Sequence, residues 1–286
     1  MAGRGKGPRS YLSSDPIGLS DYYTKYMDIK YDENSKERYV GKESYYHASG
    51  AGFCSRKLYY ESVLKAEKTN EVDDESKRKM RLGTIVHEDF QNSLSELYIQ
   101  NNIYINNIYK DNIYIDKEKK YIKKKKVNFH IEQEIIIEEI NVRGFYDIVA
   151  VEDEGGCVYL YDLKTVGGYQ WKAKFGRNPT DASHNYKLQL GTYGYAVKQK
   201  FGRLDGMFLF FYNKDTSALN NVPVPESFVN LAYNYWVNIN KEHERGLPDF
   251  MLGISPAEKW ACNYCAFKDM CNPPDFSNHI KRVRYV

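Results

Sequence analysis

Apolar and polar residues alternate along the middle of the chain in the manner of β-strands. This alternation predicts three consecutive strands over 127–139, 141–153 and 157–166, with a turn at 154–156 between the last two. A continuous apolar run predicts a further strand at 206–212, and a weaker pattern predicts a short one at 219–224. We expect these segments to form one sheet.

Helical spacing of apolar residues is found on both sides of these strands. We expect a helix directly after Ser55, a second over 82–100, a third over 182–200, and a fourth over 226–245 that Gly246 and Pro248 end. The apolar stripe of the second helix is Ile85, Val86, Phe90, Leu94 and Leu97. The core-facing stripe expected on the fourth is Phe228, Leu231, Ala232 and Tyr235. Strands followed by a helix and another strand predict an α/β fold with a mixed central β-sheet flanked by helices.

The segments around this predicted core differ from it in composition. Residues 1–20 are rich in Gly, Ser, Arg and Pro, so we expect the N-terminal extension over 1–46 to be partly disordered. Residues 101–126 are of low complexity and end in a lysine block, which predicts a surface hairpin or mobile insertion with a solvated charge run. The main domain spans 47–275, and a basic tail over 276–286 follows it.

Composition sets only broad limits on function. A chain of 286 residues can bury a sizeable core, as one large domain or two small ones, and its net charge of +3 does not by itself indicate nucleic-acid binding. No signal-peptide pattern opens the chain, and apolar runs such as 207–211 are too short to cross a bilayer. We therefore expect a soluble cytoplasmic protein with no membrane partner. The Asn, Ile and Lys bias near 100–126 suggests an AT-rich genome.

Four of the five cysteines form a pattern typical of metal ligands. Cys262, Cys265 and Cys271 make a C-x2-C-x5-C run, which is a poor disulfide framework and a good source of soft thiolate ligands. Such a group needs a fourth ligand, and Cys54 at the edge of the first predicted helix is the candidate. Cys157 lies in the apolar stretch CVYLY, where a buried structural thiol is expected.

A second candidate site lies on the predicted strands. Asp162 and Lys164 are two residues apart, so strand alternation places both side chains on one face. A hairpin would bring Asp147 of the preceding strand alongside Asp162. Two carboxylates on adjacent strands suit Mg²⁺, which can activate a bound water, and a neighbouring lysine can orient that water or neutralise developing charge. A D-x-K tripeptide arises by chance about once in such a chain and by itself indicates only an exposed ion pair.

Further polar residues stand at workable spacings around these two strands. His87 lies in the second predicted helix, where its imidazole could face the carboxylates, although a single histidine is more often structural. Gln189 and Tyr193 are four apart and so share one helix face. Glu134 is a candidate outer carboxylate whose role no spacing fixes. It is the agreement among these pieces that favours a site over chance.

Taken in order, these motifs resemble the PD-(D/E)xK nuclease superfamily, and within it the RecB-like branch whose members carry an iron–sulphur cluster. The resemblance covers about residues 47–273 through CSRKLYYE, GTIVH, GFYD, DLKT, QLGTY and the cysteine run. That branch includes CRISPR-associated RecB-like nucleases, AddB-type helicase-nucleases, exonuclease V and phage exonucleases. Tyr146 stands where the superfamily's name has a proline, which RecB-like members commonly lack, and the insertion over 101–126 has no counterpart in the family pattern.

The resemblance implies a role for each motif residue. It makes His87, Asp147 and Asp162 ligands of Mg²⁺ or Mn²⁺ together with the carbonyl of Leu163, makes Lys164 the catalytic lysine, and assigns Gln189 and Tyr193 to an accessory motif. It also makes the cysteines ligands of a structural [4Fe–4S] cluster, within a segment over 254–275: Cys54, Cys262, Cys265 and Cys271. Zinc is the competing occupant, because four thiolates suit it equally on geometry.

The function implied is a metal-dependent DNA nuclease, an exonuclease on single-stranded ends in phage or prokaryotic replication or recombination. Processing of CRISPR spacer precursors is an alternative activity of the same kind. Two other classes stay open: a non-catalytic DNA-binding module with the same fold, and a zinc-held structural protein whose D-x-K match is accidental. The sequence leaves open the cleavage polarity, the strand preference and the oligomeric state.

Overall fold

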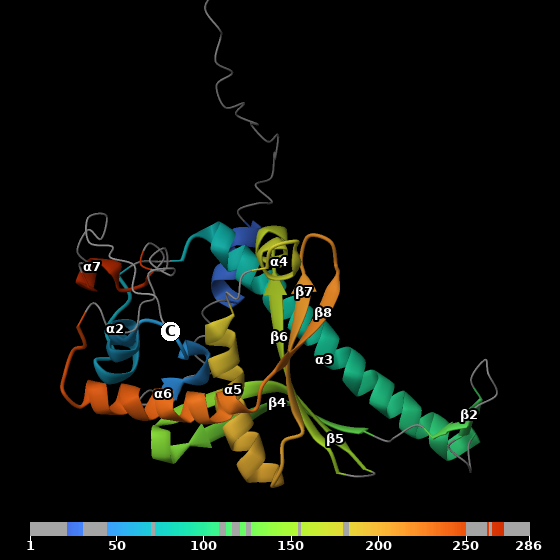
Figure 1. The fold of residues 1–286 in the computed structure, drawn as a ribbon. Helices are drawn as coiled ribbons and strands as arrows, with labels where there is room; N and C mark the ends of the chain where they lie inside the picture. The colour runs from blue at the N-terminus through green and yellow to red at the C-terminus, as the bar shows by residue number, and fades with distance from the viewer. Residues whose placement is uncertain are drawn as a thin grey trace, which may run out of the picture.

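The computed structural model describes residues 22–30, 45–69, 72–108, 113–115, 121–123, 127–153, 156–179, 183–249, 262 and 265–271, with backbone alone between 97 and 123. Its centre is a mixed six-stranded sheet (Figure 1). The strand order is β1 (Tyr46–His47), β5 (Val142–Glu152), β6 (Val158–Val166), β7 (Gly206–Asn213) and β8 (Leu219–Val224). The sixth strand, β4 (Val127–Ile137), pairs with β5.

The sheet combines an antiparallel hairpin series with one parallel crossover. β4, β5 and β6 pair antiparallel in sequence order, as the short turns expected between them predict. β6 and β7 pair parallel, so the chain crosses between them through α4 (Gly168–Phe175) and α5 (His184–Phe201). The predicted α/β fold with a mixed sheet and flanking helices is confirmed. The sequence pattern missed α4, a short helix bounded by glycines.

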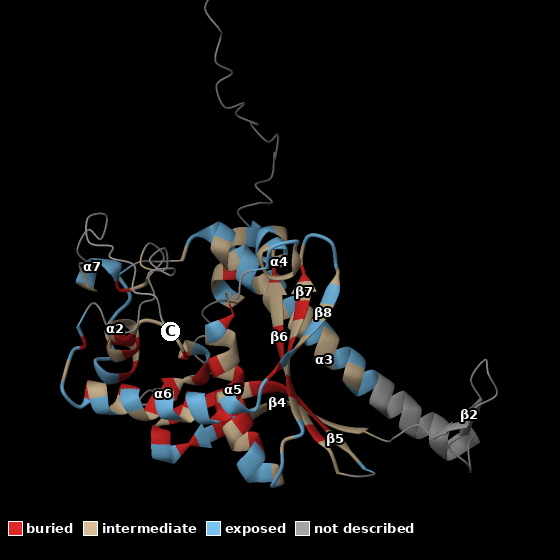
Figure 2. Ribbon diagram, in the orientation of Figure 1, coloured by how far each residue is buried: buried red, intermediate tan, exposed pale blue. Residues whose placement is uncertain are grey.

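The core lies between the sheet and the helices α5 and α6 (Ser227–His243), which pack against each other where they cross (Figure 2). Their close approach depends on Gly191, where an added Cβ would lie 2.2 Å from the carbonyl oxygen of Phe228. Trp236 is fully buried at this interface, and its indole N–H donates to Thr192 Oγ1 at 2.9 Å. The largest buried side chains of the strands include Leu160, Met207, Leu209 and Phe211.

The face that α6 buries differs in part from the predicted one. Its buried residues are Val229, Ala232, Trp236, Ile239 and His243, at successive three- and four-residue spacings. Leu231, expected in the core, is 49% exposed. That part of the prediction is wrong. The stripe that runs from Val229 through Trp236 to His243 determines which face of the helix turns toward the core, and Leu231 lies outside this stripe.

Helix α3 (Asp74–Ile108) is longer than predicted at both ends. It begins before residue 82 because the Asp73 carboxylate caps it, accepting hydrogen bonds from the Ser76 backbone and hydroxyl. Its far end takes up the first part of the 101–126 insertion. The expected hairpin follows as β2 (Ile113–Ile115) and β3 (Tyr121–Lys123), paired antiparallel. Of the helices in the described ranges, none has both the length and the apolarity that spanning a membrane requires.

Segments from the two ends of the main domain pack together, as Figure 1 shows for α2 and α7. α2 (Ser55–Leu58) follows Cys54, which occupies its N-cap as predicted, and continues into a π-helical turn, η2 (Tyr59–Val63). The C-terminal helix α7 is Lys268–Cys271. Next to it, Phe267 is buried, with its ring 5.5 Å from that of Tyr60. The predictions for residues 1–20 and 276–286 fall outside the described residues.

Candidate active site

The candidate site forms where β5 and β6 stop pairing. The ladder between them runs from Val151↔Val158 to Ile148↔Tyr161. Beyond that point the Leu163 N–H donates to Asp147 Oδ2 at 2.6 Å instead of to a backbone carbonyl. A side-chain carboxylate therefore takes the place of a strand in satisfying this amide, and Asp147 is fixed in the opening between the two strands.

Asp162 and Lys164 lie on one face of β6, as their spacing predicts. Asp162 is almost completely buried, and Lys164 Nζ lies 2.5 Å from its Oδ2. Burial and the nearby Asp147 raise the pKa of Asp162 to about 6, although the Lys164 ammonium opposes the shift. Burial also disfavours the charged form of Lys164, but the Asp162 and Asp147 carboxylates outweigh it and raise the pKa of the lysine.

His87 approaches these carboxylates from α3. Its Nδ1 lies 3.7 Å from Asp147 Oδ1. Burial opposes the imidazolium, but the Asp147 carboxylate outweighs it and raises the pKa of His87. The helix comes close to β6 one turn earlier, at Gly83, where an added Cβ would lie 3.0 Å from Thr165 Oγ1. The small residue therefore lets His87 reach Asp147.

Gln189 and Tyr193 enter from α5, on one helix face as predicted. Gln189 Nε2 donates to the Tyr193 hydroxyl at 3.1 Å. Tyr193 is buried, and burial followed by the charge of Asp162 raises the pKa of its phenol. The ring packs over Gly144 of β5, where an added Cβ would lie 2.9 Å from Tyr193 Cε1. This pair is thus held against the same strand that carries Asp147.

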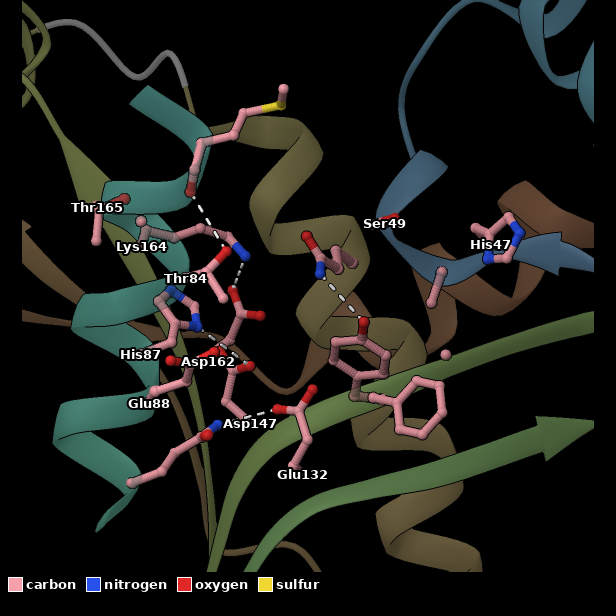
Figure 3. A pocket seen from close by; sticks show the side chains of 18 of the residues that line it. His47, Ser49, Thr84, His87, Glu88, Glu132, Asp147, Asp162, Lys164 and Thr165 are labelled. Carbon is pink, nitrogen blue, oxygen red and sulfur yellow. Dashed lines mark hydrogen bonds and ion pairs between the residues drawn. The ribbon is translucent and has the colours of Figure 1, made fainter. Parts of the chain in front are cut away.

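All six of these side chains line one cavity of about 700 Å³. Figure 3 shows His87, Asp147, Asp162 and Lys164 converging from α3, β5 and β6. The structure therefore brings together residues that are up to 106 positions apart in the sequence, from His87 to Tyr193. Leu163 is buried and its N–H bonds Asp147, while the role predicted for its carbonyl stays a prediction.

Several cavity residues were not anticipated from the sequence. Glu134, the candidate outer carboxylate, is exposed and does not line the cavity, whereas Glu132 does. The signal that could have found Glu132 is register, because β4 and β5 pair so that Glu132 falls opposite Asp147. The other unanticipated lining residues with charged or amide side chains are Lys79, Glu88, Gln91, Arg143 and Lys214.

The donor set at this site suits a hard divalent cation. Asp162 Oδ2 is fully buried, and the Lys164 ammonium lies 2.5 Å from it. In the same ranges, no three His, Cys, Asp or Glu side chains are already gathered as a metal-binding group. A cation beside Asp147 and Asp162 would offset both the burial and the mutual repulsion that raise the pKa of Asp162.

The four cysteines of the predicted cluster come from segments that pack against each other. Burial raises the pKa of the Cys54 thiol, and Cys271 and Cys262 raise it further. Burial likewise raises the pKa of Cys262, with added contributions from Cys265 and Cys271. The thiols thus lie within electrostatic range of one another. Cys157, predicted to be buried, is half-buried, with its Sγ 3.9 Å from Arg203 Nη2.

Comparison with models of known protein families shows to which superfamily the chain belongs. The model of the PD-(D/E)XK nuclease superfamily matches residues 112–272, more than half of the chain. The chain belongs to the PD-(D/E)XK nuclease superfamily. This PD-(D/E)XK match includes Asp147, Asp162 and Lys164, and it confirms the resemblance at the level of the superfamily. The RecB-like branch and the cluster stay predictions.

Solved structures match this PD-(D/E)XK chain at low sequence identity. One is the crystal structure of SSO0001, at 18% identity and a TM-score of 0.47, covering 89% of this chain and 96% of that one. Another is an alkaline exonuclease from Laribacter hongkongensis, at 10% identity and a TM-score of 0.41, covering 74% and 94%. No curated protein sequence matches the chain.

Proposed function

We propose that this chain is a Mg²⁺- or Mn²⁺-dependent deoxyribonuclease that hydrolyses phosphodiester bonds with a metal-activated water. The observation that carries the proposal is the convergence of His87, Asp147, Asp162 and Lys164 on one cavity. Membership of a nuclease superfamily supports it. A charged lysine beside two buried carboxylates is an arrangement expected for chemistry on a phosphate. An ion pair with only a structural role on the surface would be exposed to solvent.

Asp147, Asp162 and His87 would hold the cation, together with the carbonyl of Leu163. When bound, the cation would supply a lowered water pKa and a positive charge beside the scissile phosphate. The hydrogen bond from Leu163 N–H fixes Asp147 Oδ2, which leaves Oδ1 on the side of His87. Asp162 presents its buried Oδ2, which also pairs with the Lys164 ammonium. These two oxygens are the ones we assign to the cation.

Lys164 has the role of the catalytic lysine in this proposal. Its ammonium is held in the charged form by the Asp162 and Asp147 carboxylates, which raise its pKa. A charged ammonium at this place would orient the attacking water by donating a hydrogen bond to its oxygen. Its positive charge would also stabilise the negative charge that develops on the phosphorane. Gln189 and Tyr193, hydrogen-bonded to each other on one face of α5, would contact the substrate strand.

The substrate we propose is single-stranded DNA entered from an end, in phage or prokaryotic replication or recombination. The resemblance to RecB-like exonucleases supports this choice. Processing of CRISPR spacer precursors is one alternative function, and non-catalytic DNA binding by the same fold is a second alternative. Digestion of single and double DNA strands labelled at the 5′ or the 3′ end, with Mg²⁺, with Mn²⁺ or with EDTA, tests the proposal. Metal-dependent release of mononucleotides or short fragments is expected, and no cleavage with either metal would leave only the binding module.

The second part of the proposal is a [4Fe–4S] cluster held by Cys54, Cys262, Cys265 and Cys271. The mutual effects of these thiols on their pKa values support it, as does the packing of Phe267 in the C-terminal segment on Tyr60 of η2. The cluster would close the loop between Cys54 and Cys262. By analogy with a disulfide, closing a loop of roughly two hundred residues removes unfolded-state entropy worth about 5 kcal/mol. Anaerobic purification tests it: absorbance near 400 nm and bound iron are expected, whereas stoichiometric zinc without iron would show the competing occupant.

A further inference from the structure

Glu132 of β4 stands opposite Asp147 in a ladder that is distorted at this one place. The pairs Ile131↔Ile148 and Gln133↔Tyr146 are both formed, and the Glu132–Asp147 position lies between them. Glu132 has φ +47°, in the left-handed region that residues other than glycine rarely adopt. A strand interior offers no turn that would require this conformation.

Two features at Glu132 oppose folding. Its backbone is strained, since an L-residue with a Cβ is disfavoured in the left-handed region. Its carboxylate also enters the same cavity as that of Asp147 on the neighbouring strand, and like charges on paired strands are destabilising. Strain of this kind persists at ligand sites, where the surrounding structure holds it in place.

The side chain of Glu132 is held toward the cavity. Gln91 Nε2 donates to Glu132 Oε2 at 2.9 Å, and Gln91 lies one helical turn after His87 on α3. Both Glu132 and Gln91 line the cavity that contains Asp147 and Asp162. Figure 3 shows Glu132 beside Asp147, reaching in from the neighbouring strand. The Glu132 charge is also among those that raise the pKa of Tyr193, after burial and the charges of Asp162 and Asp147.

We propose that Glu132 is a third carboxylate of the divalent-cation site and that its strained backbone is retained for this purpose. The inference rests on the proposed metal-dependent function of Asp147 and Asp162. Carboxylates from three adjacent strands, β4, β5 and β6, then face one cavity. Hard oxygen ligands of this kind suit Mg²⁺ or Mn²⁺, and a cation between them removes the repulsion of Glu132 and Asp147.

Metal binding without DNA tests the proposal directly. Calorimetric titration of the full chain with Mn²⁺ is compared between the wild type and Glu132→Gln, which keeps the shape and loses the charge. We expect the Mn²⁺ affinity of Glu132→Gln to fall by about tenfold or more. The matched control is Glu134→Gln, which alters an exposed carboxylate two positions along the same strand, and its affinity should equal that of the wild type.

A glycine substitution separates the metal role from a structural one. In EDTA, Glu132→Gly should melt at a higher temperature than the wild type, since strain and repulsion are both relieved, while its Mn²⁺ affinity falls. Lys65→Gly is the control, because Lys65 has a similar φ of +50° and is exposed outside the cavity. It should raise the melting temperature and leave Mn²⁺ affinity unchanged.

Asp162→Asn distinguishes failure of this inference from failure of the proposed function. If Asp162→Asn binds no Mn²⁺ while both Glu132 variants bind it as the wild type does, Glu132 is no ligand and the inference is overturned. If Asp162→Asn binds Mn²⁺ normally, the proposed metal site itself is wrong. Loss of affinity in both Asp162→Asn and Glu132→Gln, with Glu134→Gln unaffected, is the result expected.

Discussion

The Leu163 N–H donates to Asp147 Oδ2 at 2.6 Å, just beyond Ile148↔Tyr161, the last pair of the ladder between β5 and β6. This single hydrogen bond ties the candidate metal ligand to the strand that carries Asp162 and Lys164. It gives Asp147 two separable roles, as an acceptor that satisfies a buried amide and as a negative charge facing His87.

Substitution at Asp147 should separate these roles. Asp147→Asn keeps an acceptor for Leu163 N–H and loses the charge, so cleavage should be abolished at nearly unchanged stability. Asp147→Ala also leaves that amide unsatisfied, which should lower the free energy of unfolding by about 1–3 kcal/mol. Urea denaturation of both variants, next to a cleavage assay, measures the difference. Equal stability of the two variants would show that the hydrogen bond contributes little.

The approach of α5 to α6 predicts a large effect from one methyl group. Gly191→Ala would place a Cβ 2.2 Å from the Phe228 carbonyl oxygen. Because that oxygen belongs to the backbone of α6, the clash can be relieved only by moving one of the two helices. We expect a loss of about 1–3 kcal/mol in the free energy of unfolding. Gly167→Ala is the matched control, because an added Cβ there meets nothing within 4 Å. Similar melting temperatures for both variants would contradict the packing described between these helices.

Acid should destabilise the fold through the half-buried His47. Burial, followed by the charge of Arg143, lowers the pKa of His47 from 6.5 to about 4. Because the folded state binds the proton less readily than the unfolded chain, stability is complete above pH 6.5 and declines as the pH falls toward 4. His47→Gln should lessen this decline between pH 6.5 and 4, measured as the melting temperature relative to wild type at each pH. An identical pH dependence in the variant would exclude His47 as a contributor.

The cysteines should act on stability rather than on chemistry. Cys54→Ala should lose the iron content and the absorbance near 400 nm, and it should melt at a lower temperature, because the proposed cluster joins α2 to the C-terminal segment. Cys157→Ala is the control, since Cys157 lies outside this group of thiols. A Cys54→Ala protein with full cluster content would mean that a different group is the fourth ligand.

The elements of the sheet could be predicted because their residues alternate or form a continuous apolar run, and the site could be predicted because its residues lie on these strands and on two predicted helices. Asp162 and Lys164 share a face by strand geometry alone, and Gln189 and Tyr193 do so by helix geometry. The superfamily match confirms the family assigned from these motifs. The roles of the individual residues stay predictions.

Features that depend on tertiary packing could not be predicted in this way. The rotation of α6 depends on the fit of Trp236 beside Thr192, so Leu231 was misplaced. The choice between Glu132 and Glu134 depends on the register of β4 against β5 and on a local φ, neither of which alternation reveals. The start of α3 depends on a cap at Asp73 that precedes its apolar stripe.

The central claim is that the cavity around Asp162 hydrolyses DNA with a divalent cation. The most direct measurement is cleavage of end-labelled single-stranded DNA in Mg²⁺ by wild type, Asp162→Ala and Lys164→Ala, each first shown to be folded by its melting curve. The account predicts metal-dependent cleavage by the wild type and loss of at least a hundredfold in both variants, in line with the removal of a transition-state charge. Wild-type cleavage by folded Asp162→Ala would contradict it.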